Sequence, residues 1–398
     1  MSFSFSQKKH SSGARLMTEG NIAKQLILFA LPLLVGNLFQ QLYNTVDSIV
    51  VGNYVSKTAL AAVGSTDCII NTIIGFFSGL STGAGVVISH NFGSRDDKAL
   101  HCTVHTTIAL TLVLAVFFTI AGLFLSPFFL RLMDTPEDVL PESSRYLTIY
   151  FAGVSGLMLY NMGAGILRAV GDSTRPLYIL IVCAVTNIIL DIVFVKYMGM
   201  RSLGAALATV VAQGLSFVLS MIYLKRSDFI FDFKLKSFKI YKDKLNLIFK
   251  IGCPSAVQFS ITGLSFLALT GISNAIAGTV GTTLLGIGQK LNTFGILPCI
   301  ALSSSISSMA GQNIGAKKYD RAKKTMWIGM GFALALSVVV FGLVNLFPNQ
   351  IMGIFLNKNS LSGTDLELYE QCVEIGAKYI SLCSFDYLFA CVFFCTNR

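Results

Sequence analysis

The chain has 398 residues; 54% are hydrophobic, 13% are charged, and the formal net charge is +10. Soluble domains carry about 25% charged residues, so this composition excludes an ordinary water-soluble fold. The apolar runs reach the roughly 20 residues that a helix needs to cross a bilayer. They are continuous rather than alternating, which excludes a membrane β-barrel. The sequence therefore predicts an all-α polytopic membrane protein.

About ten spans are expected, in two groups. A polar N-terminal tail at 1–24, with no cleavable signal peptide, precedes a first lobe of six spans at 25–224. A basic cytoplasmic linker at 225–247 follows, and four spans form a second lobe at 248–398. The expected spans are 25–51, 58–90, 101–130, 147–170, 176–198, 203–224, 248–275, 281–310, 325–346 and 376–396.

The first span carries polar residues at intervals of three and four, which places them on one helix face. They are Asn37, Gln40, Gln41, Asn44 and Asp47. Such a stripe faces the helix bundle or a water-filled cavity rather than lipid. The amides alone favour another interpretation, hydrogen bonds that hold helices together. A carboxylate inside a span is costly, so Asp47 favours a functional site.

The fifth span adds Asn187 and Asp191, which are four residues apart and so share a helix face. The sixth span adds the hydroxyl of Thr209. With Asp47, these side chains supply a set of hard oxygen ligands that suits Na⁺, or two carboxylates that share a proton. They predict a cation-coupling site for Na⁺ or H⁺, with no other metal and no cofactor.

Two further ionisable residues, Lys290 and Asp386, lie inside spans of the second lobe. They could form an ion pair, or Asp386 could bind a cationic substrate or a proton. Position 269, which an internal repeat pairs with Asp47, is Leu. The coupling site is therefore expected in the first lobe alone.

The internal repeat has a fixed displacement of 222 residues. It pairs Pro32 with Pro254, Gly64 with Gly286, Asn91 with Asn313, and Gly93 with Gly315. Because six spans precede the linker, the repeats run parallel and are related by an axis along the membrane normal, with substrate between them. We therefore expect two six-helix lobes, the second incomplete because the chain is truncated before its last two helices.

The basic residues lie mainly on one side of the expected topology. With the N-terminus in the cytoplasm, the cytoplasmic segments carry most Lys and Arg, including Arg168 and Arg175, whereas opposite loops at 134–142 and 365–370 are acidic. This is the positive-inside pattern of a multi-pass cell-membrane protein, so no nucleic-acid partner is expected. The sequence has no glycine-rich phosphate loop, and neither ATP hydrolysis nor enzymatic activity is expected.

Several motifs resemble those of the multidrug and toxic compound extrusion (MATE) family. They are Leu-Tyr-Asn-Thr-Val-Asp-Ser-Ile-Val-Val-Gly at 42–52, Leu-Arg-Ala-Val-Gly-Asp-Ser-Thr-Arg-Pro at 167–176, Asn-Ile-Ile-Leu-Asp at 187–191 and Gly-Gln-Asn-Ile-Gly at 311–315. The resemblance implies twelve helices in two lobes and the antiport of organic cations or other amphipathic compounds against Na⁺ or H⁺.

The resemblance also implies roles for particular residues. It assigns a first-lobe cation site to Asp47, Asn187, Asp191 and Thr209, and it matches Asn161 to a further asparagine of the family. The chain departs from the family where some members have a glutamate in the seventh helix, because Gln258 lies in that region. Asp386 matches a tenth-helix acid only loosely.

Three other functions are weighed against antiport. A flippase for lipid-linked precursors needs a cavity lined with several Arg or Lys residues, whereas the charges inside these spans are mainly acidic. An intramembrane enzyme needs clustered acidic motifs that this sequence lacks. A scaffold would leave the paired carboxylates unexplained. The expected partners are therefore small amphipathic or cationic molecules and the bilayer, and we expect a monomer.

Overall fold

The computed structural model describes residues 14–54, 57–132, 140–226, 239–355 and 364–396; for some helical residues, among them 47–54 and 57–69, only the backbone is described. Within these ranges the chain is helical and contains no strand. The elements are α1 (Ile22–Tyr54), α2 (Lys57–Gly93), α3 (Asp97–Leu132), α4 (Leu140–Ala169), α5 (Thr174–Asp191), the π-helical segment η1 (Ile192–Tyr197), α6 (Arg201–Arg226), α7 (Lys242–Gly315), α8 (Tyr319–Leu346), α9 (Pro348–Phe355), α10 (Thr364–Cys383) and α11 (Phe385–Thr396).

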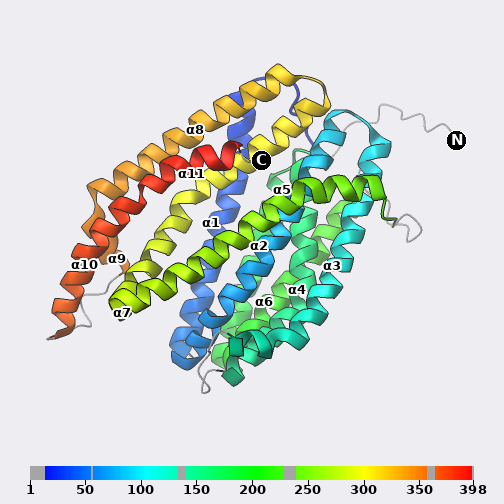
Figure 1. Cartoon of the computed structure of the whole chain (residues 1–398). Coiled ribbons are helices and arrows are strands. Elements are labelled where there is room, and N and C mark those ends of the chain that lie inside the picture. Colours follow the sequence, from blue (N-terminus) through cyan, green and yellow to red (C-terminus); the bar gives the residue numbers. More distant parts are fainter. Residues whose placement is uncertain (1–13, 55–56, 133–139, 227–238, 356–363, 397–398) are drawn as a thin grey trace.

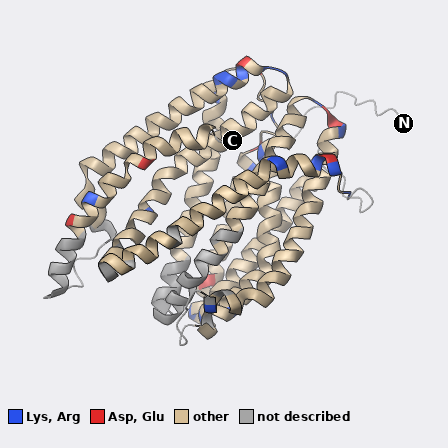
Figure 2. Ribbon diagram, in the orientation of Figure 1, with Lys and Arg blue, Asp and Glu red and all other residues tan. Residues whose placement is uncertain are grey.

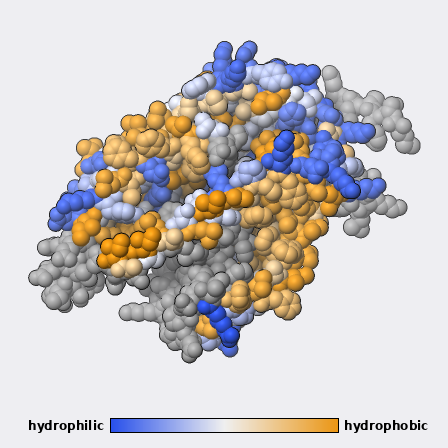
Figure 3. Space-filling view, viewed as in Figure 1, coloured by the Kyte–Doolittle hydropathy of each residue, from blue (hydrophilic) through white to orange (hydrophobic). Residues whose placement is uncertain are grey.

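The outer faces of the helices are apolar and exposed. Among the described residues, nine segments are long and apolar enough to cross a membrane. The remaining expected span, 58–90, corresponds to α2, many of whose side chains lie outside the description. Large side chains such as Phe124 on α3 and Trp327 on α8 are 78% and 62% exposed, and hydrophobic surface covers the flanks in Figure 3. Such apolar surfaces are stable in contact with lipid. The predicted polytopic all-α fold is therefore confirmed.

Helix α7 is one continuous helix of 74 residues. A straight helix of this length would reach about 110 Å, far more than a bilayer spans, and Figure 1 shows it doubling back into two arms. The apolar segments Lys242–Ser273 and Leu284–Gly315 agree with the two expected spans. The two expected spans are therefore confirmed as two arms, although the backbone stays helical through the bend that joins them.

The last expected span, 376–396, is not one helix but two. Helix α10 ends at Cys383 and α11 begins at Phe385, with Ser384 between them. The Ser384 hydroxyl donates to the carbonyl of Ser381 at 2.6 Å and accepts from Nδ2 of Asn345 at 2.8 Å. A serine that bonds to nearby backbone competes with the helical ladder, which explains the break. The short helix α9 was not expected either.

Two bundles are visible in Figure 1, α2–α6 and the group of α8, α10 and α11, with α1 and the arms of α7 between them. Their cores are distinct. Leu26, Phe29 and Leu33 of α1 belong to the cluster built by the second arm of α7, α8 and α11. Conversely, Ile248 of the first α7 arm lies in the cluster of α2–α6. Each lobe thus receives the start of the other lobe's first helix.

The end of α2 meets the end of α7 in a two-fold arrangement. A Cβ atom at Gly93 would overlap the carbonyl of Gln312, and one at Gly315 would overlap the carbonyl of His90. These two contacts exchange under the displacement of 222 residues, which also pairs Ser89 with Gly311, a residue that it contacts directly. The axis therefore passes between Ser89 and Gly311, and the parallel repeat is confirmed. Only glycine lets these backbones approach so closely.

The N-terminal segment 15–20 crosses this junction as a strap. On the first lobe, the backbone N–H of Arg15 donates to the carbonyl of Val170 at 3.0 Å. In the middle, the N–H of Met17 donates to Oε1 of Gln312 at 2.8 Å, and Nε2 of Gln312 donates to the carbonyl of Ala169 at 3.0 Å. One glutamine side chain therefore bonds both to the strap and to the first lobe.

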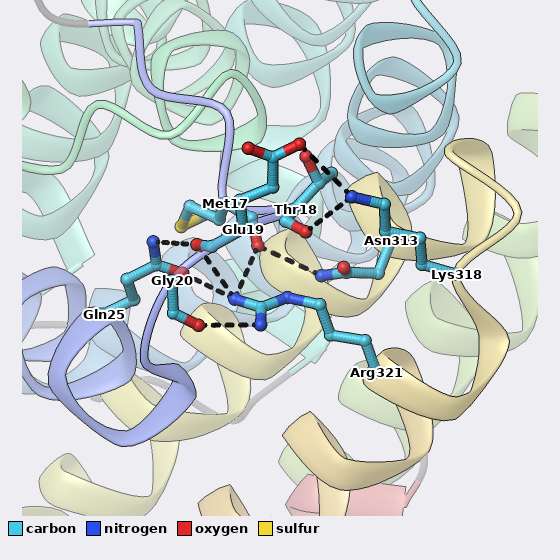
Figure 4. Close-up of polar contacts among 8 residues, drawn as sticks. All are labelled: Met17, Thr18, Glu19, Gly20, Gln25, Asn313, Lys318 and Arg321. Carbon is cyan, nitrogen blue, oxygen red and sulfur yellow. Dashed lines mark hydrogen bonds and ion pairs between the residues drawn. The ribbon is translucent and has the colours of Figure 1, made fainter.

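The second lobe holds the strap with cationic donors (Figure 4). Arg321 donates to the carbonyls of Gly20 and Glu19 at 2.8 and 3.1 Å, and Lys318 donates to the carbonyl of Thr18 at 3.1 Å. Met17 is 3% exposed. Residues 15–20 of the expected N-terminal tail thus pack at the junction, where Gln312, Lys318 and Arg321 bond to their backbone groups.

Candidate substrate cavity and coupling site

A small cavity of about 90 Å³ lies inside the first lobe, between α1, α4, α5 and α6. Polar side chains from all four helices line it. They include Asn37, Gln40, Tyr43, Tyr160, Asn161, Arg168, Asn187, Thr209, Gln213 and Ser216. The cavity thus collects the sequence-predicted Asn37, Gln40, Asn161, Asn187 and Thr209 at one place.

Two amide oxygens in this lobe face the cavity region without a donor. Nδ2 of Asn187 donates to the hydroxyl of Thr209 at 3.5 Å, the outer limit for such a bond. The Oδ1 atom of Asn187 and the Oε1 atom of Gln213 are buried and have no hydrogen-bond partner within the described part of the chain. Buried carbonyl oxygens without donors are uncommon and costly, and they suit a bound cation or a protonated group.

Asp191 lies one helical turn beyond Asn187, is 0% exposed and ends α5. The π-helical segment η1 begins at the next residue, and such local widening of a helix is frequent at functional sites. The structure therefore brings Asn187, Asp191 and Thr209 into one region of the lobe. Asp47 lies on α1, the helix that supplies Asn37 and Gln40, but its side chain lies outside the described residues.

A second cavity of about 300 Å³ lies between the lobes, bordered by α1, α2, α4 and both arms of α7. Hydroxyl groups dominate its polar lining: Ser78, Ser81, Thr82, Ser304, Ser307 and Ser308. Thr82 and Ser304 are partners in the 222-residue repeat, so this cavity lies across the two-fold axis. Asn37, Gln40 and Asn161 line both cavities, which makes the two spaces neighbours with shared walls.

Arg168 also lines both cavities. The sequence placed this arginine in a cytoplasmic segment; it lies in the last turn of α4, and its side chain also lines the two cavities. The sequence analysis did not predict this cavity position, because it took a basic residue near a span end only as an orientation signal. The positions of Asn161, Gly165 and Arg168 are separated by four and three residues, which is one helix face, and this pattern could have revealed it.

The other sequence candidates lie apart from these cavities. Gln41 is half-buried and Asn44 is exposed on α1, while Gln258 lines a separate cleft with Thr82 and Pro254. Lys290 and Asp386 both have exposed side chains and form no ion pair with each other. The described structure thus gathers the first-lobe candidates and leaves the second-lobe pair separate.

These features define a class: a multi-pass helical membrane protein with two pseudo-symmetric lobes and a polar cavity between them, which is the architecture of a secondary transporter. Residues 32–193 and 254–398 match the MatE family. The chain belongs to this family. Its members are transporters, so the chain is a transporter rather than an enzyme.

Similar proteins extend over most of the chain. The probable multidrug resistance proteins YpnP and YoeA of Bacillus subtilis (strain 168) are 29% and 30% identical, over 96% and 85% of this chain and 82% and 74% of their own. Among solved structures, a MOP superfamily transporter from Pyrococcus furiosus Vc1 (DSM3638) has a TM-score of 0.86 at 24% identity, covering 98% of this chain and 86% of its own. That structure supports the fold.

Proposed function

We propose that the chain exports small amphipathic or cationic compounds by antiport against Na⁺ or H⁺. The carrying observation is the polar first-lobe region, where Asn187 contacts Thr209 and a fully buried Asp191 lies one turn away. The relatives named as multidrug resistance proteins support the substrate range. A buried carboxylate that takes up a proton or Na⁺ couples ion occupancy to the packing of the lobe.

The coupling ion would be held by oxygen atoms that this lobe provides. Oδ1 of Asn187 and Oε1 of Gln213, both without donors in the described structure, are available as ligands or acceptors. Asp191 supplies the charge, and we assign Asp47 of α1 as the second carboxylate. Ion binding would draw α1 and α5 together at the wall of the cavity that Asn37 and Gln40 share with the inter-lobe space.

The strap and the glycine junction close one end of the molecule. Figure 2 shows Lys and Arg concentrated at that end, and by the positive-inside rule we assign it to the cytoplasmic side of the cell membrane. In this state the cavity is closed toward the cytoplasm. Loading from the cytoplasm then requires the Gln312 and Arg321 contacts with the strap to separate, which is the rocking of one lobe against the other. We assign this cycle to a monomer, since both lobes belong to one chain.

Flipping of a lipid-linked precursor is a second candidate, and Arg168 in the inter-lobe cavity is the observation that favours it. The charges within the spans were expected to be mainly acidic, whereas the described lining of this cavity carries a cation. A pyrophosphate headgroup nevertheless calls for several cations, and Arg168 is the one Lys or Arg among the residues that line it. Translocation of a fluorescent lipid-linked pyrophosphate in proteoliposomes, without flux of Na⁺ or H⁺, would support this alternative.

Flux measurements test the main proposal. The protein is reconstituted into proteoliposomes, a fluorescent amphipathic dye is loaded, and dye export is followed with radioactive sodium uptake and internal pH. Dye export that accelerates with an inward Na⁺ or H⁺ gradient, accompanied by movement of the same ion, is the expected result. Dye export that ignores both gradients would overturn antiport.

A further inference from the structure

Three arginines near the lobe junction have different surroundings. Arg321 donates to the strap carbonyls. Arg175 lies 3.3 Å from Oδ2 of Asp172, and its guanidinium stacks 4.2 Å from the ring centroid of Tyr223. Arg168, in contrast, makes no ion pair and its guanidinium donates no hydrogen bond to any residue that the structure describes. Arg321 and Arg175 have structural partners, whereas Arg168 lines a cavity with its donors unused.

The space beside Arg168 is shaped by a glycine. A Cβ atom at Gly165 would lie 3.0 Å from Oγ of Ser81 and 3.9 Å from Nη2 of Arg168. The hydroxyl from α2 and the guanidinium from α4 therefore lie on the same side of Gly165, where a side chain would crowd Ser81 and approach Arg168. The Ser81 hydroxyl donates only to the thioether of Met162, at 3.9 Å. We call Ser81, Gly165 and Arg168 the cradle.

The charge of the cavity is one-sided. Among the cavity-lining residues whose side chains the structure describes, none is Asp or Glu, and Arg168 carries the one formal charge in each lining. The six hydroxyls and three amides of the inter-lobe cavity add hydrogen-bond donors. A guanidinium presents its N–H groups in a planar fork that matches carboxylate and phosphate oxygens. A carboxylate or phosphate is the group that completes this arrangement.

An alternative role for Arg168 is purely local. It lies in the last turn of α4, where a cation interacts favourably with the helix dipole and can bond to the last carbonyls. The carbonyl of Arg168 accepts from the N–H of Gly171, and those of Ile166 and Leu167 accept from Val170 and Asp172. Backbone donors thus already satisfy this helix end, which leaves the guanidinium for the cavity.

We propose that the cradle binds the anionic group, a carboxylate or a phosphate, of an amphipathic molecule in the inter-lobe cavity. This inference rests on the proposed transport function and narrows its substrates to amphipaths that carry such a group, including zwitterions. Ser81 and Arg168 come from helices of the first lobe, while Ser304 and Ser308 of α7 face the same cavity from the other side. The apolar part of the substrate would lie against Leu33, Phe259 and Ile300.

The test compares three fluorescent probes that differ only in headgroup: pyrenebutyrate, pyrenebutanamide and a pyrenebutyl trimethylammonium salt. Their binding to the full chain is titrated in nanodiscs of zwitterionic lipid, with empty nanodiscs subtracted. A charged hydrogen-bonded pair is worth about 1.5 kcal/mol or more, so the carboxylate should bind about tenfold more tightly than the amide. Equal binding of the two, or preference for the ammonium probe, would overturn the proposal without any mutation.

Variants then test whether the preference for the carboxylate probe arises from the cradle. Arg168→Gln should weaken pyrenebutyrate about tenfold while leaving the amide unchanged, and Arg168→Lys should restore part of the loss. Arg131→Gln, an exposed arginine at the end of α3, is the control for net charge. A wild-type preference that survives in a folded Arg168→Gln variant would overturn the assignment. If that variant does not fold, Gly165→Ala provides the second test, because its methyl group would enter the space between Ser81 and Arg168.

Anionic lipid could supply the same chemistry as a solute. Repeating the titration in nanodiscs that contain phosphatidylglycerol separates the two sources. Competition that depends on Arg168 assigns the cradle to a lipid phosphate as well, and its absence restricts the cradle to the solute. If the protein does not export the dye but still prefers the carboxylate probe, the proposed transport is refuted and the cradle stands. If it exports the dye but shows no preference for the carboxylate probe, only the cradle is refuted.

Discussion

The junction between the lobes and the cavities beside it are both polar, yet their polar groups are arranged differently. At the junction, Gln312, Lys318 and Arg321 each donate to carbonyls of the strap or of the facing lobe. In the cavities, Oδ1 of Asn187 and Oε1 of Gln213 have no hydrogen-bond partner, and the guanidinium of Arg168 forms no ion pair, within the described structure. Paired polar groups hold a conformation, whereas unpaired ones are costly in a closed protein and are retained where a ligand completes them.

The largest effect is expected at Asp191, which tests whether the polar groups near the first-lobe cavity serve function rather than stability. Asp191→Asn keeps the shape of the side chain but removes its charge, so ion movement should uncouple from export. Dye efflux driven by an ion gradient should fall to the level of liposomes without protein, and the thermal transition of the variant is measured alongside to separate lost coupling from lost folding. Asp386→Asn, an exposed acid of the second lobe, is the matched control and should retain efflux. Equal loss in both variants would contradict a first-lobe coupling site.

At the lobe junction, substitutions should lower the stability of the fold rather than the coupling of transport to an ion. At Gly315 a side chain would overlap the carbonyl of His90, so Gly315→Val should destabilise the fold by about 3 kcal/mol, the upper range for overpacking. The measurement is the thermal transition of the detergent-solubilised protein. Gly331 of α8 has open space around it, and Gly331→Ala should leave the transition unchanged or raise it. Similar losses from both substitutions would show that the close approach at Gly315 is not what matters.

The strap offers a smaller effect that separates pairing from packing. Arg321→Ala removes donors to Gly20 and Glu19, and a charged hydrogen bond contributes about 1.5–3 kcal/mol. Amide hydrogen exchange in residues 14–20 should therefore accelerate by about tenfold to a hundredfold. Lys324→Ala, an exposed lysine one turn further along α8, should leave the exchange unchanged. Unaltered exchange in Arg321→Ala would mean that the strap is held by its backbone bonds alone.

The sequence predicted most of this fold, because a bilayer imposes a length and an apolar character on each span. It also predicted the parallel repeat and the grouping of Asn187 with Thr209, since helical spacing and a constant displacement are visible in the chain. The strap was missed because residues 15–20 have no periodicity and are held through backbone carbonyls, which leave no mark in the side-chain pattern.

Two other features, the position of Arg168 and the continuity of α7, were not predicted because they depend on packing. Arg168 was missed because a cation at a span end has two meanings, orientation and cavity lining, and only packing distinguishes them. The helical bend of α7 depends on how α1, α2 and α8 pack against its two arms. The hydropathy of each span carries no information about this packing.

The smallest effect is expected at Asp172, a carboxylate beside the strap. Burial raises the pKa of Asp172 above its usual range, while hydrogen bonds from the backbone of Arg175 and Thr174 and the charge of Arg175 lower it. Because the folded pKa is the higher one, ionisation opposes folding, so stability should decrease as pH rises through the unfolded and then the folded pKa. Asp172→Asn keeps an oxygen for the bonds from Thr174 and Arg175.

This variant should therefore change stability at neutral pH by only about 1 kcal/mol, because the lost ion pair and the relieved burial cost of the carboxylate offset each other, and it should flatten the acid end of the profile. Thermal transitions of wild type and variant between pH 4 and pH 7 measure both effects. A large loss of stability in Asp172→Asn at neutral pH would show that the ion pair with Arg175 outweighs burial. In that case the junction beside the strap would also depend on this pair of charges.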